Sequence, residues 1–197
     1  KRLVKYLDKE KIITTYNNNA IKNGVYFNAK KMDLSDIRAV RKSHSESAIL
    51  AKRAGYDIIY VYAGHNLSLA QHFLLSRYNQ RTDEYGGSLK NRTRLLRELI
   101  EDTKDAVGDT CAVAVRLSVD ELLGSEGLEA KNEGAEIIRL LGELPDLWDL
   151  NISDWSNDSQ TSRFATEGYQ ENYIQFMKQL TSKPVVGVGR YTDPDHM

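Results

Sequence analysis

Short apolar runs alternate with longer amphipathic stretches along most of this chain. Four runs have the length and the β-branched or aromatic content of buried strands, at residues 57–62, 111–117, 147–152 and 184–189. They lack polar alternation, so we expect parallel strands that are covered on both faces. Apolar positions at helical spacing predict helices over residues 33–55, 88–108, 135–144 and 172–180. Strands that alternate with helices predict βα units and a parallel sheet.

The boundaries of two helices carry local signals. Asp33 or Ser35 can cap the first helix, and Ser88 can cap the second, which ends near Gly108. Residues 1–32 are less regular, although 12–16 and 24–27 have the character of short strands. We expect a leading segment at 1–32 and one α/β domain at 33–197.

Composition narrows the class of protein. The 27 Lys and Arg residues nearly balance the 28 Asp and Glu residues, so charge favours neither nucleic acid nor an anionic membrane as a partner. Cys111 is the single cysteine, which excludes an internal disulfide and a cysteine-cluster metal site and favours the cytoplasm. No His, Asp or Glu spacing suggests a metal site. No apolar run reaches the ~18 residues of a membrane span.

The chain begins at Lys1, and residues 191–197 resemble the start of a further helix. We therefore expect it to be a piece of a longer protein.

Residues able to do chemistry gather where the predicted strands end. They are Tyr62, His65, Arg116, Trp155, Asp158, Gly189 and Arg190. In a TIM barrel the carboxyl ends of the strands carry the active site, often with a phosphate site after the last strands. A doubly wound sheet would place its ligand at the same ends. Four strands are half of an eight-stranded barrel, so the barrel interpretation makes this a partial one.

Each of these residues has a functional and a structural interpretation. His65 has an ordinary pKa near ~6.5, and Asp158 could orient it in a relay with Tyr62. Alternatively, Tyr62 is a core aromatic, His65 is satisfied by backbone groups and Asp158 belongs to a turn. Trp155 could attract a ligand cation through its ring face or simply cover the barrel rim.

The remaining candidates are groups that would meet negative charge. Arg116 ends an apolar strand and could stabilise charge on a cofactor or oxyanion, or it could be a partnered structural residue. Gly189 and Arg190 could bring backbone N–H groups and a guanidinium to a phosphate. His72 and the charged residues of RTDEYGG are better interpreted as a network that orders a loop.

Several motifs together resemble a known family. They are YAGH from Tyr62, YNQRTDEYGGSLKNR from Tyr78, VAVRL from Val113, WDLNISDWSND from Trp148 and GVGR from Gly187. This set, from about Met32 to Met197, is similar to the old yellow enzyme family of FMN-dependent (β/α)8 barrels. Tyr62 stands where carbonyl-reducing members usually have His, and Asp158 lies three residues after Trp155. Those features resemble the trimethylamine dehydrogenase branch, which includes dimethylglycine demethylation enzymes.

The resemblance implies specific roles. Tyr62, His65 and Asp158 would form the catalytic relay, Trp155 a wall of the substrate site, and Arg116 a contact to the flavin. It implies oxidative demethylation or dehydrogenation of a methylated amine, an electron-acceptor protein as a partner and possible homo-oligomers. It also places the cysteines of a 4Fe-4S cluster beyond Met197. The alternatives are an ene-reductase or dienoyl-CoA reductase that uses NAD(P)H, and a truncated barrel without catalysis.

Overall fold

The computed structural model describes residues 31–196, of which 31–44 belong to one unit and 45–196 to another. The predicted strands at 12–16 and 24–27 lie outside the described residues. Helix α2 (Leu34–Arg53) spans the boundary between the units. Of the two predicted caps, Asp33 is the one used: its carboxylate accepts hydrogen bonds from the backbone N–H groups of Ser35 and Asp36, at 2.8 and 3.0 Å.

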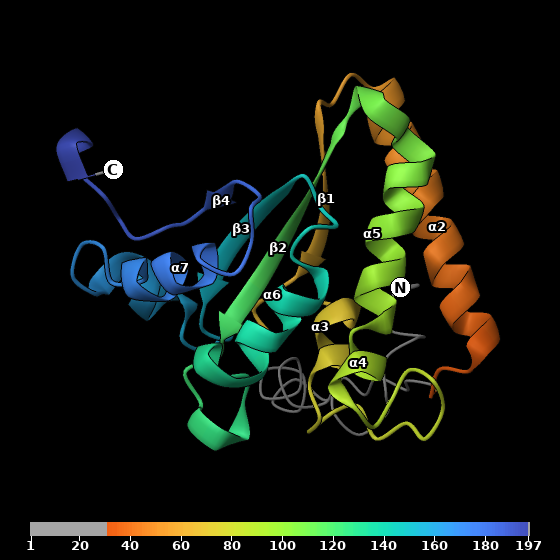
Figure 1. Cartoon of the computed structure of the whole chain (residues 1–197), viewed down its shortest axis with the longest axis horizontal. Helices are drawn as coiled ribbons and strands as arrows, with labels where there is room; N and C mark the ends of the chain where they lie inside the picture. The colour runs from red at the N-terminus through yellow and green to blue at the C-terminus, as the bar shows by residue number, and fades with distance from the viewer. Residues whose placement is uncertain (1–30, 197) are drawn as a thin grey trace, which may run out of the picture. The chain divides into compact units, whose positions relative to one another are not determined.

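The second unit is built on a parallel four-stranded sheet with the order β1-β2-β3-β4 (Figure 1). Its strands are β1 (Ile58–Ala63), β2 (Ala112–Asp120), β3 (Leu147–Ile152) and β4 (Val185–Val186). The connecting helices are α3 (Leu69–Leu74), α4 (Leu89–Arg92), α5 (Arg94–Val107), α6 (Ala135–Leu141) and α7 (Glu171–Lys178). Because all three strand pairs are parallel, the carboxyl ends of the four strands lie along one edge of the sheet.

One face of this sheet forms the apolar core. Its side chains are almost fully buried and are those of Ile59, Val61, Val113, Val115, Leu117, Trp148, Leu150 and Ile152. The opposite face is more open, since Ile58 and Tyr60 are 46% and 45% exposed. Within the described residues the first strand is therefore covered on one face and not on both. The alternation of exposed and buried side chains along β1 does not show in the sequence, because both faces of the strand carry apolar or aromatic side chains.

Three other predictions needed correction. The strand predicted to reach residue 189 pairs only at Val185 and Val186, because β4 lies at the sheet edge and runs into two glycines. The helix predicted from Ser88 is broken at Thr93 into α4 and α5, although Ser88 caps it as expected and Gly108 ends it at φ +60°. The polar loop after β1 contains α3, which the Ser68 hydroxyl caps.

Two kinds of feature are absent from the described part of the chain: a helix that could span a membrane and a cluster of metal-binding side chains. None of its helices has both the length and the apolar character needed to cross a bilayer. No group of three or more His, Cys, Asp or Glu side chains there is arranged to hold a metal ion.

Candidate active site

The strand register places a row of polar side chains on the open face of the sheet. Tyr62 on β1 pairs with Arg116 on β2, and Arg116 pairs with Asp149 on β3. The Arg116 guanidinium lies 3.1 Å from a carboxylate oxygen of Asp149. Asp149 is buried, whereas a third of the Arg116 side chain remains exposed. Arg116 is thus a partnered arginine whose side chain remains partly exposed.

Tyr62, His65 and Asp158 come together although 93 residues separate the last two. The Tyr62 hydroxyl lies 2.9 Å from Nδ1 of His65. Nε2 of the same ring lies 3.2 Å from Oδ1 of Asp158, although it is not aligned for a hydrogen bond with any described residue. His65 is 6% exposed, so the ring is enclosed between its two partners. The structure therefore brings these three side chains together.

His65 owes its position to an unusual backbone conformation. His65 and Asn66 both lie in the left-handed region, with φ of +55° and +57°, which few residues other than glycine adopt. The His65 N–H donates to the Ser118 hydroxyl at 2.8 Å, and the His65 carbonyl accepts from the Trp155 N–H at 3.1 Å. These two bonds tie the turn after β1 to β2 and to the loop after β3.

Burial sets the protonation states of the relay. It raises the pKa of Tyr62, a change that the positive charge of Arg116 opposes and Asp158 adds to. It also lowers the pKa of His65, while the negative charge of Asp158 offsets part of that effect. At neutral pH we therefore expect a neutral Tyr62 hydroxyl that donates to Nδ1, which leaves the imidazole proton on Nε2, 3.2 Å from the Asp158 carboxylate.

The other predicted residues lie on the loops around this relay. Trp155, on the loop after β3, is 57% exposed. Gly189 is buried and accepts the Gly168 N–H at 2.8 Å through its carbonyl. Arg190 has φ +55° and donates to the carbonyl of Arg163 at 2.9 Å. None of these contacts places Gly189 or Arg190 beside the relay.

Two polar strand residues near the relay were not predicted from the sequence. Ser118 and Asn151 lie opposite each other on β2 and β3, on the same strands as Arg116 and Asp149. Both are almost fully buried, and the Asn151 amide nitrogen has no hydrogen-bond partner among the described residues. Their signal in the sequence was a polar residue two positions beyond another polar residue within an apolar strand.

The RTDEYGG segment is an ordered network, as the sequence suggested. The Arg81 guanidinium pairs with Asp83, and the Tyr85 hydroxyl donates to Glu98 at 2.8 Å. The Asn79 amide donates to the carbonyls of Phe73 and Tyr85, both at 2.7 Å. These contacts fix the segment that carries the chain from β1 to α4.

His72 gives this region a pH dependence. Burial lowers its pKa, although the backbone carbonyl of Asn66 at 3.1 Å from Nε2 acts in the opposite direction. In the unfolded chain a histidine titrates near ~6.5, so on acidification the unfolded state gains a proton that the folded state does not. We expect the Tm of the full-length protein to fall between pH 7.5 and 5.5, and to fall less for His72→Gln. An equal fall for both proteins would contradict this assignment. The dependence left in His72→Gln is expected to come from His65.

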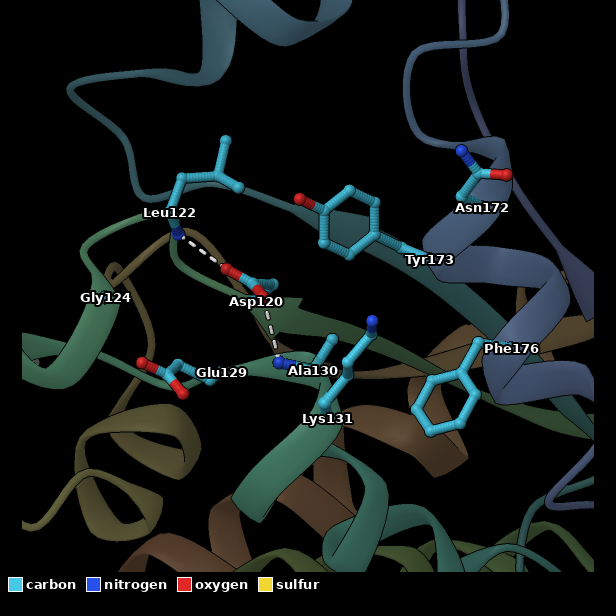
Figure 2. Close-up of a pocket in the computed structure, with 9 residues that line it drawn as sticks. All are labelled: Asp120, Leu122, Gly124, Glu129, Ala130, Lys131, Asn172, Tyr173 and Phe176. Carbon is cyan, nitrogen blue, oxygen red and sulfur yellow. Dashed lines mark hydrogen bonds between the residues drawn. The ribbon is translucent and has the colours of Figure 1, made fainter.

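A separate hollow of about 600 Å³ lies between the loop after β2 and helix α7 (Figure 2). Lys131, Tyr173 and Phe176 are among its lining residues, whereas the relay residues are not. Both carboxylate oxygens of Asp120 are used to fold the loop, since they accept the N–H groups of Leu122 and Ala130 at 2.8 and 2.9 Å. This hollow is therefore shaped by loop closure and is distinct from the relay.

Comparison with known proteins identifies the family. The sequence signature of the NADH:flavin oxidoreductase / NADH oxidase family matches residues 6–197. The chain belongs to this family. Its four-stranded sheet with covering helices is accordingly part of a (β/α)8 barrel, as expected from the sequence.

Several members of the NADH:flavin oxidoreductase family are closely similar to it. Dimethylamine dehydrogenase of Hyphomicrobium sp. (strain x) is 39% identical over 168 residues, which are 84% of this chain and 23% of that protein. The structure of 6-hydroxypseudooxynicotine amine oxidase from Pseudomonas geniculata N1 is 54% identical with a TM-score of 0.83, over 87% of this chain and 26% of that one. Histamine dehydrogenase from Rhizobium sp. 4-9 is 47% identical with a TM-score of 0.80, over 87% and 25%. The chain thus spans about a quarter of the length of these relatives.

Proposed function

We propose that this chain carries the substrate side of the active site of an FMN-dependent amine dehydrogenase, with a methylated amine as the substrate. The observation that supports this most directly is the continuous contact from Tyr62 through His65 to Asp158. Three of the similar proteins are named for the oxidation or dehydrogenation of amines, which favours the same substrate class here.

The residues around the relay suit a cation. The exposed Trp155 ring offers a face to which a desolvated ammonium ion can bind with ~2 kcal/mol or more. The Asp158 side chain is 32% exposed, so its negative charge also reaches the site. A carbonyl substrate would instead need hydrogen-bond donors at this position. Tyr62 supplies only one such donor, and that donor faces His65.

The relay can take a proton from a bound ammonium group. The Tyr62 hydroxyl would pass its proton to Nδ1 of His65 and accept the substrate proton in its place. Asp158 would stabilise the imidazolium ion that results. The neutral amine that remains has the lone pair needed to release a hydride from an adjacent carbon, giving an iminium ion. Water hydrolyses this ion to an aldehyde and a smaller amine, which is a demethylation when a methyl group is lost.

The chain contains groups that suit FMN. The partly exposed Arg116 cation and the unpartnered, buried Asn151 amide nitrogen fit a group with anionic and acceptor atoms, and Gly189 and Arg190 suit its phosphate. Bound FMN would supply the hydride acceptor. The Arg116 cation would favour negative charge at the flavin edge.

Three further features of the whole protein are proposals. An electron-acceptor protein would reoxidise the enzyme, and a 4Fe-4S cluster would need cysteines outside these residues, because Cys111 is the only one here. Further copies of the same protein would be a second kind of partner, in a homo-oligomer. The single cysteine favours the cytoplasm.

Anaerobic flavin bleaching of the full-length protein tests the proposal. Dimethylated or trimethylated amines, or methylated glycines, are expected to bleach the flavin without a nicotinamide cofactor. Bleaching by NADPH with reoxidation by enones, and no response to any amine, would instead favour an ene-reductase. No bleaching under either condition would indicate a barrel without catalysis.

A further inference from the structure

Two polar residues interrupt the apolar strands beneath His65. Ser118 on β2 and Asn151 on β3 are 0% and 1% exposed, and they pair in register. The Ser118 hydroxyl donates to Oδ1 of Asn151 at 2.6 Å. Burying two polar side chains in this way costs free energy unless their bonds are made, so their presence calls for a reason.

The Ser118 hydroxyl also accepts the backbone N–H of His65 at 2.8 Å. A hydroxyl has a single hydrogen, and Asn151 accepts it, which leaves an oxygen lone pair for the His65 N–H. Asn151 therefore fixes the direction of the Ser118 hydroxyl, and Ser118 fixes the peptide that precedes the His65 ring.

The turn leaves little room for another arrangement. A Cβ atom at Gly64 would lie 3.1 Å from the Tyr62 ring and 3.2 Å from the Ser118 hydroxyl oxygen. The turn therefore packs closely between the tyrosine of the relay and the serine below it. His65 itself is held at φ +55°, a conformation that is unfavourable for a residue with a Cβ atom unless other bonds compensate.

We propose that Ser118 and Asn151 are positioning residues that hold the His65 backbone in its left-handed conformation and so keep the ring between Tyr62 and Asp158. This inference rests on the proposed function only for its kinetic consequence. The geometric consequence can be tested whether or not the protein oxidises amines. Misplacement of a catalytic group by about 1 Å can cost on the order of 100-fold in rate.

Ser118→Ala removes the acceptor of the His65 N–H and leaves the strand apolar. Thr103→Val is the matched control, because it also removes a buried hydroxyl, one that donates to the Leu99 carbonyl within α5, away from the relay. Asn151→Ala is a second test, since it frees the Ser118 hydroxyl to rotate. All three variants are made in the full-length, FMN-loaded protein.

Crystal structures and anaerobic flavin reduction give two independent measurements. In Ser118→Ala we expect His65 to leave the left-handed region and the Tyr62–His65 contact to lengthen beyond hydrogen-bond distance. The rate constant for flavin reduction by the amine should fall about 10- to 100-fold, with an altered pH profile. Asn151→Ala should displace His65 in the same direction but less, and this variant is judged on the His65 geometry alone, because its amide nitrogen is also a proposed contact to FMN. Thr103→Val should leave both measurements unchanged.

The two measurements separate the possible failures. If wild-type protein does not respond to amines while Ser118→Ala still displaces His65, the proposed function fails and the positioning role stands. An unchanged His65 geometry in both Ser118→Ala and Asn151→Ala would overturn the positioning role. So would equal losses of rate in Ser118→Ala and Thr103→Val.

Discussion

Tyr62→Phe in the full-length protein is expected to slow flavin reduction by the amine by about 100- to 10,000-fold, the range typical of a lost acid–base group. The substitution removes the hydroxyl that contacts His65 and keeps the ring that packs against the turn. His65→Gln should also slow the reaction, because an amide cannot accept a proton as imidazole does. Stopped-flow absorbance under anaerobic conditions measures both rates.

The pH dependence of the flavin-reduction rate tests whether His65 accepts the proton. A protonated His65 cannot accept the Tyr62 proton, so the wild-type rate should fall on acidification. Burial lowers the pKa of His65, which places this fall below the ordinary value of ~6.5. Both variants should lose that acidic limb. Tyr173→Phe is a suitable control, because Tyr173 lines the separate hollow beside α7. Wild-type rates and profiles in both Tyr62→Phe and His65→Gln would remove these residues from the relay.

Periodicity predicted the elements whose burial is uniform. The strand at residues 147–152 was placed to the residue, since five of its six side chains are buried and the flanking residues are polar. The short helix α3 was missed because it depends on one local cap, the Ser68 hydroxyl, within a polar stretch. The break at Thr93 was missed because Thr93 stays near helical backbone angles, with φ −78° and ψ −10°, and no side-chain cap marks the start of α5. The two faces of β1 could not be distinguished from the sequence, because Tyr60 and Tyr62 on one face are aromatic and Ile59 and Val61 on the other are aliphatic, so no polar residue marks the open face.

The sequence predicted the residues of the candidate site but not the buried residues that hold them in place. A parallel sheet places strand ends at one edge, which is why Tyr62, His65 and Asp158 could be expected to meet. Nothing in the spacing of Ser118 or Asn151 relates them to His65, since the link is a side chain bonded to a backbone N–H across 53 residues. Contacts of that kind become visible only when the strand register is known.

The network around the RTDEYGG segment is anchored by a buried ion pair. Glu121, just after β2, is fully buried and accepts two bonds from the Arg77 guanidinium, at 2.5 and 2.7 Å. Burial alone would lower the pKa of Arg77, but its bonds to Glu121 outweigh that effect and raise it. The same carboxylate accepts the Leu128 N–H at 2.9 Å. It therefore joins the segment after β1 to the loop after β2.

Glu121→Ala is accordingly expected to destabilise the protein by about 3–5 kcal/mol, because it leaves a largely buried guanidinium and a buried N–H without their acceptor. Glu136→Ala is the matched control: Glu136 pairs with Arg139 on the surface of α6, where both side chains are about half exposed, so the loss should be at most about 1 kcal/mol. Urea unfolding followed by circular dichroism measures both. Equal, small shifts in the two variants would show that Glu121 does not hold the loops together. A large shift in Glu121→Ala alone would mean that one carboxylate holds the segment after β1 and the loop after β2 together.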